Sequence, residues 1–330
     1  MRMMMLSISL LIIYLSFSTH VHGQNTCEAF IDLTLIIDSS GSVPPDDFEQ
    51  GKKALLDLVS RLNVGTDKAG VAVINFSSTM SLSAQTDVFE FERMNLLQQV
   101  ADLQRLGQNT ATGDALALAN TYCQARCRPA AKAIPRVFAI FTDGHSNEGR
   151  PAIPAAEALR SSPIEGTIFA VGIGNIGTDG DTELLGIAGD RDYVLNIASY
   201  LDLARVTNAI TMKMCQFPAF VLPDIKVQGE MTGNSSRYYK MHTLKKIKKN
   251  AFFEIEMKDH IGKTTIYTST TNKNPSSYSS KTVSSRAVGG GNTYTTFVPA
   301  DAENFYFSVK GVAANLNQYD FVVRVRPLDF

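Results

Sequence analysis

The chain has few of the residue patterns on which enzymes and zinc proteins depend. It contains only five histidines and four cysteines among 330 residues, and their spacing does not match a zinc site. It also lacks the Gly-x-Ser-x-Gly motif that carries the nucleophile of many hydrolases. Two of the five histidines lie within the first 23 residues, which leaves few candidates for acid–base chemistry. We therefore expect a protein that is not an enzyme.

Long apolar runs are also scarce, and the one near the N-terminus is too short to cross a bilayer. Leu6–Phe17 is apolar, whereas a membrane-spanning helix needs about 20 such residues. Arg2 precedes this run and Val21-His22-Gly23 follows it, as in a secretory signal with a small-residue exit site. Residues 1–23 are therefore predicted to be a signal peptide, and the mature chain is predicted to be secreted and extracellular, without a membrane span.

The small net charge of −1 hides an opposite balance in the two halves of the chain. Residues 24–216 hold 15 Lys and Arg against 23 Asp and Glu, whereas residues 217–330 hold 15 against 9. An acidic part joined to a basic part indicates two domains with different surfaces. The length of the mature chain also favours two hydrophobic cores. We expect neither domain to bind nucleic acid.

Residues 24–216 alternate between strand and helix patterns. Strands are expected at 30–38, 70–76, 137–143, 167–172 and 193–197, with a short edge segment at 80–84. Helices are expected at 44–62, 92–106, 113–126, 153–159, 181–188 and 200–215. This alternation predicts an α/β fold, a doubly wound and mostly parallel sheet flanked by helices in the Rossmann-like manner.

Helical periodicity ends at Phe217-Pro218, and short β-rich runs follow. Strands are expected at 219–228, 237–244, 251–257, 264–270, 293–298, 304–312 and 319–325, with a polar loop at 272–285. About seven short strands separated by turn residues predict an all-β antiparallel sandwich for residues 217–330.

Three oxygen-rich segments lie where strands of the α/β domain end or a helix begins. Asp38-Ser39-Ser40-Gly41-Ser42 follows the first strand, Thr110 precedes the helix at 113–126, and Asp143 ends a later strand. Each segment alone is an ordinary turn or helix cap. Together they are expected at the carboxyl edge of one sheet, where open α/β sheets bind ligands. Their hard oxygens suit Mg²⁺, which keeps a position open for water or an incoming group. The candidate ligands are Asp38, Ser40, Ser42, Thr110 and Asp143.

These residues fit the pattern Asp-x-Ser-x-Ser, then Thr, then Asp, and the chain resembles von Willebrand factor type A domains with an intact metal-ion-dependent adhesion site. The flanking sequences 71–78, 142–147 and 168–174 also match that family. The resemblance implies a Mg²⁺ ion, or Mn²⁺ or Ca²⁺, whose last position is filled by an acidic residue of a partner. It also implies a disulfide between Cys27 and Cys215 that closes a long loop.

The resemblance implies a secreted adhesion or extracellular-matrix protein that binds a protein ligand, collagen or another matrix component, through the cation. One alternative is a polyanion- or carbohydrate-binding protein that uses the basic β-domain through Lys245, Lys246, Lys248 and Lys249. The same lysine run is also typical of a solvated turn between strands. Another alternative is a structural matrix protein in which the α/β domain crosslinks neighbouring molecules.

Cys123 and Cys127 are four residues apart near the end of an expected helix. Helical spacing brings their α-carbons near the upper limit for a disulfide. Because Arg128-Pro129 follows, we expect the helix to fray there and a local disulfide to form. A bond to another molecule is the alternative.

Two further residues are candidates for surface roles. His145 lies two residues beyond Asp143 and is expected either at the rim of the metal site or as an ordinary exposed imidazole. Asn234-Ser235-Ser236 is a glycosylation sequon in an expected loop, so Asn234 is the predicted glycosylation site.

Overall fold

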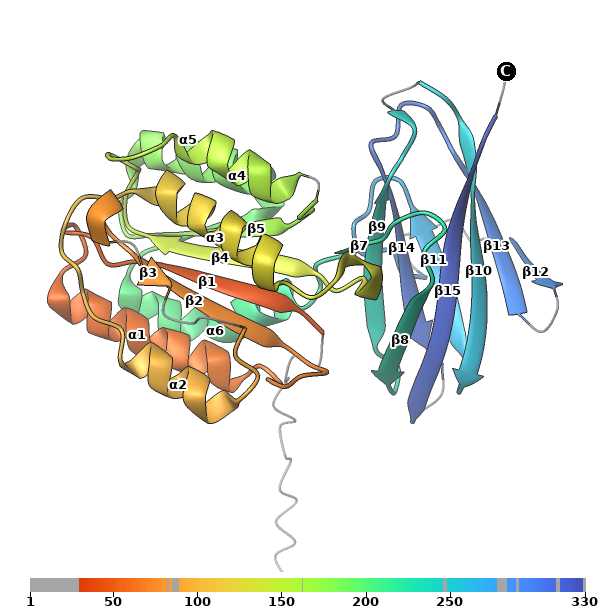
Figure 1. The fold of residues 1–330 in the computed structure, drawn as a ribbon, viewed down its shortest axis with the longest axis horizontal. Helices are drawn as coiled ribbons and strands as arrows, with labels where there is room; N and C mark the ends of the chain where they lie inside the picture. Colours follow the sequence, from red (N-terminus) through yellow and green to blue (C-terminus); the bar gives the residue numbers. More distant parts are fainter. Residues whose placement is uncertain are drawn as a thin grey trace, which may run out of the picture.

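The computed structural model describes residues 30–81, 83–84, 89–161, 163–245, 248–277, 284–288, 291–312 and 315–328. These residues form an α/β body and a β-rich body that lie next to each other (Figure 1). The predicted signal peptide at residues 1–23 and Cys27 lie outside the described residues. Within the part of the chain that is described, no helix is long and apolar enough to cross a membrane.

The α/β body is built on a six-stranded sheet with the order β3-β2-β1-β4-β5-β6. Its strands are β1 (Asp32–Asp38), β2 (Gly70–Phe76), β3 (Ser83–Ala84), β4 (Arg136–Thr142), β5 (Thr167–Ile173) and β6 (Val194–Ile197). All neighbours are parallel except β2 and the edge strand β3. β1, β2 and β5 are buried along their whole length, because helices cover both faces of a parallel sheet. The predicted mostly parallel sheet is confirmed.

Helices pack on both faces of this sheet (Figure 1). α1 (Pro45–Ser60), α2 (Arg93–Ala101) and α6 (Tyr200–Met214) cover one face, and α3 (Thr112–Arg126), α4 (Ala152–Arg160) and α5 (Gly177–Ala188) cover the other. Alternate residues of β1 serve the two cores, with Leu33 and Leu35 in the first and Ile36 in the second. The sheet therefore separates two apolar cores within one body.

Two helix boundaries differ from the prediction. α2 ends at Ala101, because the carbonyl of Leu103 accepts a hydrogen bond from Lys52 and that of Gln104 accepts one from Asn75. These carbonyls bind neighbouring elements instead of continuing the helix. α5 begins at Gly177 rather than at residue 181, and its first turn contains Asp179, whose charge favours a helix N-terminus.

The β-rich body is a sandwich of two sheets, ordered β12-β13-β10-β15-β8 and β11-β14-β9-β7. Its strands are β7 (Ala219–Phe220), β8 (Val227–Thr232), β9 (Ser236–His242), β10 (Ala251–Ile261), β11 (Thr264–Ser269), β12 (Ser284–Val288), β13 (Gly291–Val298), β14 (Asn304–Gly311) and β15 (Leu316–Pro327). Phe253, Phe307 and Phe321 are fully buried between the sheets. The hydroxyls of Tyr239 and Tyr319 share a 2.8 Å hydrogen bond across this core, so both polar tips have a partner.

The prediction for this body was wrong in two places. Residues 219–228 are not one strand, because Pro223 and Asp224, whose φ is 60°, separate β7 from β8. β7 then pairs with β9 in parallel, so the smaller sheet is mixed rather than antiparallel. No strand is predicted at β12, whose first two residues fall in the loop expected at 272–285 and whose sequence has only two apolar residues. Among the described strands it pairs with β13 alone, and such an edge strand needs no continuous apolar pattern.

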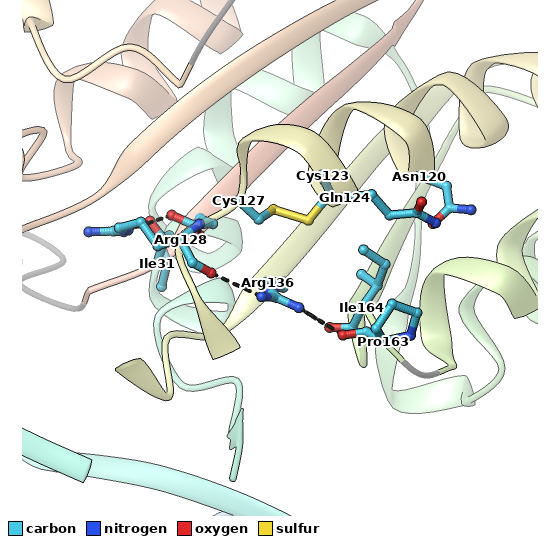
Figure 2. Close-up of a disulfide and its surroundings, with 10 residues drawn as sticks. Ile31, Asn120, Cys123, Gln124, Cys127, Arg128, Arg136, Pro163 and Ile164 are labelled. Atoms are coloured by element: carbon cyan, nitrogen blue, oxygen red, sulfur yellow. Dashed lines mark hydrogen bonds and ion pairs between the residues drawn. A yellow bond between two sulfur atoms is a disulfide. The ribbon is translucent and has the colours of Figure 1, made fainter. Parts of the chain in front are cut away.

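α3 ends in a local disulfide (Figure 2). Cys123 and Cys127 are bonded to each other, with α-carbons 4.6 Å apart. This spacing lies near the lower limit for disulfides rather than the upper one. The helix ends at Arg126 and the chain turns away at Cys127, where ψ is 146°, so the expected local bond forms at a helix end. Cys215 is also disulfide-bonded, but its predicted partner Cys27 lies outside the described residues.

Arg128, the residue after this disulfide, ties α3 to the start of β1. Its Nε and backbone N–H donate to the buried carboxylate of Asp32 at 2.7 and 2.8 Å, and its Nη2 donates to the Ile31 carbonyl at 2.7 Å. Arg136 of β4 donates in turn to the Arg128 carbonyl at 2.9 Å (Figure 2). Three elements at the amino edge of the sheet are thus joined by the guanidinium groups of Arg128 and Arg136.

Ion pairs connect the two bodies. His242 Nε2 of β9 lies 2.9 Å from Oε2 of Glu165, a buried residue between α4 and β5. Lys273, after β11, forms ion pairs with Asp190 and, at 3.2 Å, with Asp192. These contacts lie at the amino edge of the parallel sheet, so the β sandwich is attached there by groups whose charge responds to pH and salt.

The His242–Glu165 pair predicts a pH-dependent stability. The hydrogen bond to Glu165 raises the pKa of His242, so the folded chain holds this proton more tightly than the unfolded chain. The stabilisation is therefore complete below about pH 6.5 and is lost as the pH rises through the raised pKa. His242→Gln should lower the free energy of unfolding near pH 5.5 by at most about 1 kcal/mol, since the imidazole is half-exposed, and should change it little near pH 8.5. Urea titrations at both pH values measure this, and an equal loss at both would contradict it.

Candidate metal centre

The site begins with the register of β1 between its two neighbours. Asp38 pairs with Phe76 of β2, and Ile37 pairs with Phe141 of β4, so the three strands end side by side. After β1 the chain turns, and the Ser40 N–H donates to Asp38 Oδ1 at 2.9 Å. Asp commonly makes this bond to a backbone N–H two residues on. The turn brings the next hydroxyls back over the end of the strand.

Ser40, Ser42 and Asp143 are linked by short hydrogen bonds. The Oγ atoms of Ser40 and Ser42 are 3.0 Å apart, and Ser42 Oγ donates to Asp143 Oδ1 at 2.7 Å. Thr142 Oγ1 donates to Asp38 Oδ2 at 2.6 Å, which joins the end of β4 to the end of β1. Four of the five predicted ligands therefore lie in one connected group of oxygens.

Thr110 belongs to a loop that is held between the other two segments. On one side, the Gly41 N–H donates to the Gln108 carbonyl at 2.6 Å. On the other side, the Thr110 N–H donates to Asn147 Oδ1 at 2.9 Å, and the Thr110 carbonyl accepts from Ser146 Oγ at 3.1 Å. Among the described residues, none forms a hydrogen bond with the Thr110 hydroxyl. This oxygen therefore has no competing partner.

Both carboxylates of the site are held without a basic neighbour. Asp38 is 1% exposed, and burial raises its pKa to about 6, against hydrogen bonds from Thr142 and Ser40 that lower it. Burial also raises the pKa of Asp143, and the charge of Asp47 adds to that effect. Across the described part of the chain, no Lys or Arg contributes to either shift. Two carboxylates in this position favour an added positive charge.

The set of donors fits a hard divalent cation. It consists of two carboxylates and the hydroxyls of serine and threonine, which are oxygen ligands of the type that Mg²⁺ prefers. The described residues contain no cluster of three or more His, Cys, Asp or Glu, so a nitrogen- and sulfur-rich site is not found among them. The residues present would hold a divalent cation through oxygen atoms alone.

Sequence reasoning overlooked Thr142 as part of this site. It is a hydroxyl residue that follows the apolar run from Val137 to Phe141, and that position directly before Asp143 is the available signal. Its side chain is buried and orients the carboxylate of Asp38. His145 is exposed in the same loop, and its role at the rim stays a prediction.

The other predicted surface sites lie in the β sandwich. Asn234 is exposed in the turn between β8 and β9, and its glycosylation stays a prediction. In the basic run, Lys245 lies 3.7 Å from Glu303, and Lys248 and Lys249 follow in the same connection between β9 and β10. Lys246 lies outside the described residues.

The chain is thus an α/β protein with a candidate ligand site, the oxygen cluster, at the carboxyl edge of its sheet. Residues 32–209 match the family model of the von Willebrand factor type A domain, and the chain belongs to this family. Matrilin-3 of Gallus gallus is 31% identical over 191 residues, which are 56% of this chain and 40% of matrilin-3. Collagen alpha-1(XXI) of Homo sapiens is 28% identical over 185 residues, which are 56% of this chain and 18% of the collagen chain. The chain thus spans less than half the length of these relatives.

Solved structures share the fold. Proximal thread matrix protein 1 (PTMP1) from the mussel byssus superimposes with a TM-score of 0.51 and 21% identity, over 63% of this chain and 51% of PTMP1. A structure of PTMP1 with a zinc-occupied MIDAS motif gives a TM-score of 0.50 and 23% identity, over 58% of this chain and 47% of PTMP1. These similarities confirm the architecture of the α/β body.

The buried charge of Asp38 predicts that Asp38→Asn stabilises the metal-free protein. A pKa of about 6 means that ionised Asp38 opposes folding, so stability falls as the pH rises through that value. Asn removes the charge and keeps one acceptor oxygen, so we expect a gain of about 1–2 kcal/mol at about pH 7.5. Urea unfolding in EDTA measures the gain. Asp301→Asn, at an exposed position in the turn between β13 and β14, is the matched control, and a less stable Asp38→Asn protein would contradict the prediction.

Proposed function

We propose that this chain is a secreted adhesion or extracellular-matrix protein that binds an acidic residue of a protein partner through a divalent cation. The observation that carries the proposal is the hydrogen-bonded cluster of Asp38, Ser40, Ser42 and Asp143, with the loop of Thr110 beside it. These five residues are the proposed ligands. In the proposal, residues 24–216 form the type A domain, residues 217–330 form the sandwich, and residues 1–23 are the signal peptide.

The proposed roles of the side chains follow from their burial. Asp38 is sealed at the strand end and would supply fixed negative charge beneath the ion, whereas Asp143 and Ser42 are partly or fully exposed and would hold its outer side. When bound, a Mg²⁺, Mn²⁺ or Ca²⁺ ion supplies a position that an incoming carboxylate can occupy. The role is binding, since ligand exchange at the cation is sufficient to capture a partner.

The relatives support an extracellular partner. Matrilin and collagen chains share the type A domain with this protein, and PTMP1 has been seen with zinc in its MIDAS motif. A matrix protein such as a collagen is therefore the proposed ligand class. The mature chain is proposed to act outside the cell.

Asp143→Ala is expected to abolish metal binding while preserving the fold. Removing this carboxylate takes away one of two charges that hold the ion, and Asp143 is only half-buried. Mg²⁺ at about 100 times its dissociation constant should stabilise the native chain by about 2.7 kcal/mol and leave Asp143→Ala unchanged. Calorimetric titration with Mg²⁺ and thermal unfolding measure both effects. Asp179→Ala, an exposed acidic position on α5, should behave as the native chain.

Partner binding is tested with immobilised fibrillar collagen. Capture of the mature chain in Mg²⁺ should be lost in EDTA and in Asp143→Ala, and kept in Asp179→Ala. Capture that persists in EDTA and weakens with salt would instead favour the polyanion-binding alternative through the lysine run. Mg²⁺-dependent self-association without collagen binding would favour a crosslinking role. If the chain binds Mg²⁺ but neither binds collagen nor self-associates, collagen is rejected as the partner and the metal site is retained.

A further inference from the structure

A cleft of about 750 Å³ lies between the two bodies, at the amino edge of the parallel sheet and away from the metal cluster. The α/β body contributes Thr66, Asp67 and five residues between Arg128 and Ile134 to its lining. The sandwich contributes Lys226, Gln228, Gly229 and Glu230, together with residues of β9, β10 and β15. The proposed metal function makes no use of this space.

β8 lines the cleft with its outer edge. It is the last strand of the five-stranded sheet, and among the described strands it pairs with β15 alone. Directly after β8, the Gly233 N–H donates to the Asn315 carbonyl at 2.8 Å. Along an antiparallel pair, residues that form backbone hydrogen bonds with the partner strand alternate with residues that do not. Counting back from Gly233, Met231 and Gly229 direct their backbone N–H and carbonyl groups to β15. Gln228 and Glu230 therefore direct theirs away from it, and both residues line the cleft.

Gly229 allows β8 to pair closely with β15. A Cβ at Gly229 would lie 2.2 Å from the ring of Tyr319, so glycine lets β8 approach β15 over a buried tyrosine. Lys226, just before β8, pairs with Asp320 at 2.8 Å and is occupied. The strand is thus anchored on its inner side and open on its outer side.

The walls of the cleft carry an excess of positive charge. Four Lys and Arg residues line it against two carboxylates, those of Asp67 and Glu230. Arg128 is bound to Asp32, as described above, whereas neither Lys132 nor Arg237 forms an ion pair with a described residue. Lys132 is exposed, and the guanidinium of Arg237 lies 4.1 Å above the ring of Phe30. Two cations near the open edge are therefore available for an acidic group.

We infer that this cleft binds an extended peptide segment that carries an acidic side chain, which adds to the sandwich as a strand beside β8. The backbone of Gln228 and Glu230 supplies hydrogen bonds, and Lys132 and Arg237 supply charge complementarity. The segment after α3 forms the opposite wall of this cleft of about 750 Å³, so the proposed occupant is a short extended segment rather than a second copy of the whole sandwich.

The test uses the mature chain and a capped, fluorescein-labelled peptide of about seven residues with alternating threonine and valine and a central glutamate. Fluorescence anisotropy should show saturable binding that weakens with salt. A second peptide with proline at alternate positions, which removes the N–H groups needed for pairing, should bind at least about tenfold more weakly. A third peptide with lysine in place of glutamate should also lose affinity.

Two variants locate the site. Gln228→Pro removes an outward N–H at an edge position that tolerates proline, and should weaken binding by about tenfold. Lys132→Glu should weaken it by about fivefold at low salt and by less at high salt. Lys258→Glu, at an exposed position of β10 outside the cleft lining, is the charge-matched control and should bind as the native chain.

Two results with the native chain would overturn the proposal without the use of any variant. One is the absence of binding at millimolar peptide, and the other is equal affinity for the glutamate peptide and the proline peptide. Equal weakening by Lys132→Glu and Lys258→Glu would also overturn it, since binding would then follow net charge alone. Retained binding in EDTA is expected, because the cleft is separate from the metal cluster.

Discussion

The position of β1 at the centre of the parallel sheet is the constraint on which the rest of the site depends. Its residues are paired on both sides, with β2 and with β4, so its register has no freedom to shift. A slip by one residue would move its side chains to the opposite face and bury Asp38 in an apolar core. The chain runs outward from β1 to β2 on one side and returns to β4 on the other, which creates a topological switch point. Asp38 and Asp143 lie on either side of that point.

The two ends of β1 show how the structure treats buried charge. Asp32 and Asp38 are each 1% exposed, and burial raises the pKa of both. Asp32 receives the guanidinium of Arg128, and its charge is compensated within the fold. Asp38 receives only a hydroxyl and a backbone N–H. An uncompensated buried carboxylate is costly, and it persists where function requires it. The contrast favours a structural role for Asp32 and supports the proposed ligand role of Asp38.

The α/β body could be predicted in detail because its signals are local and strong. Continuous apolar runs predict β1, β2, β4 and β5. The residues that end β1 and follow β4 include most of the candidate site residues. Thr142 escaped prediction because its role depends on the distance between two strands, which a sequence does not state. Its 2.6 Å bond to Asp38 exists only once β1 and β4 are paired.

The β sandwich was predicted less well for a physical reason. Its edge strands make fewer contacts, so their sequences are less constrained. The sequence of β12, for example, has no strand pattern of apolar residues. β7 contains only two residues, and its parallel pairing with β9 follows from the turn at Pro223 and Asp224 rather than from any pattern. The contacts between the bodies, such as Glu165 with His242, join residues 77 positions apart and leave no trace in the sequence.

α6 has a further consequence for how the molecule is placed among its neighbours. The helix begins at Tyr200, beside the carboxyl edge, and its 15 residues carry the chain about 22 Å towards the sandwich at the amino edge. The metal cluster and the sandwich consequently face opposite directions. Ligands at the two proposed sites would therefore not obstruct each other, and a chain that held both would link two molecules and gain avidity where copies are arrayed along a fibre.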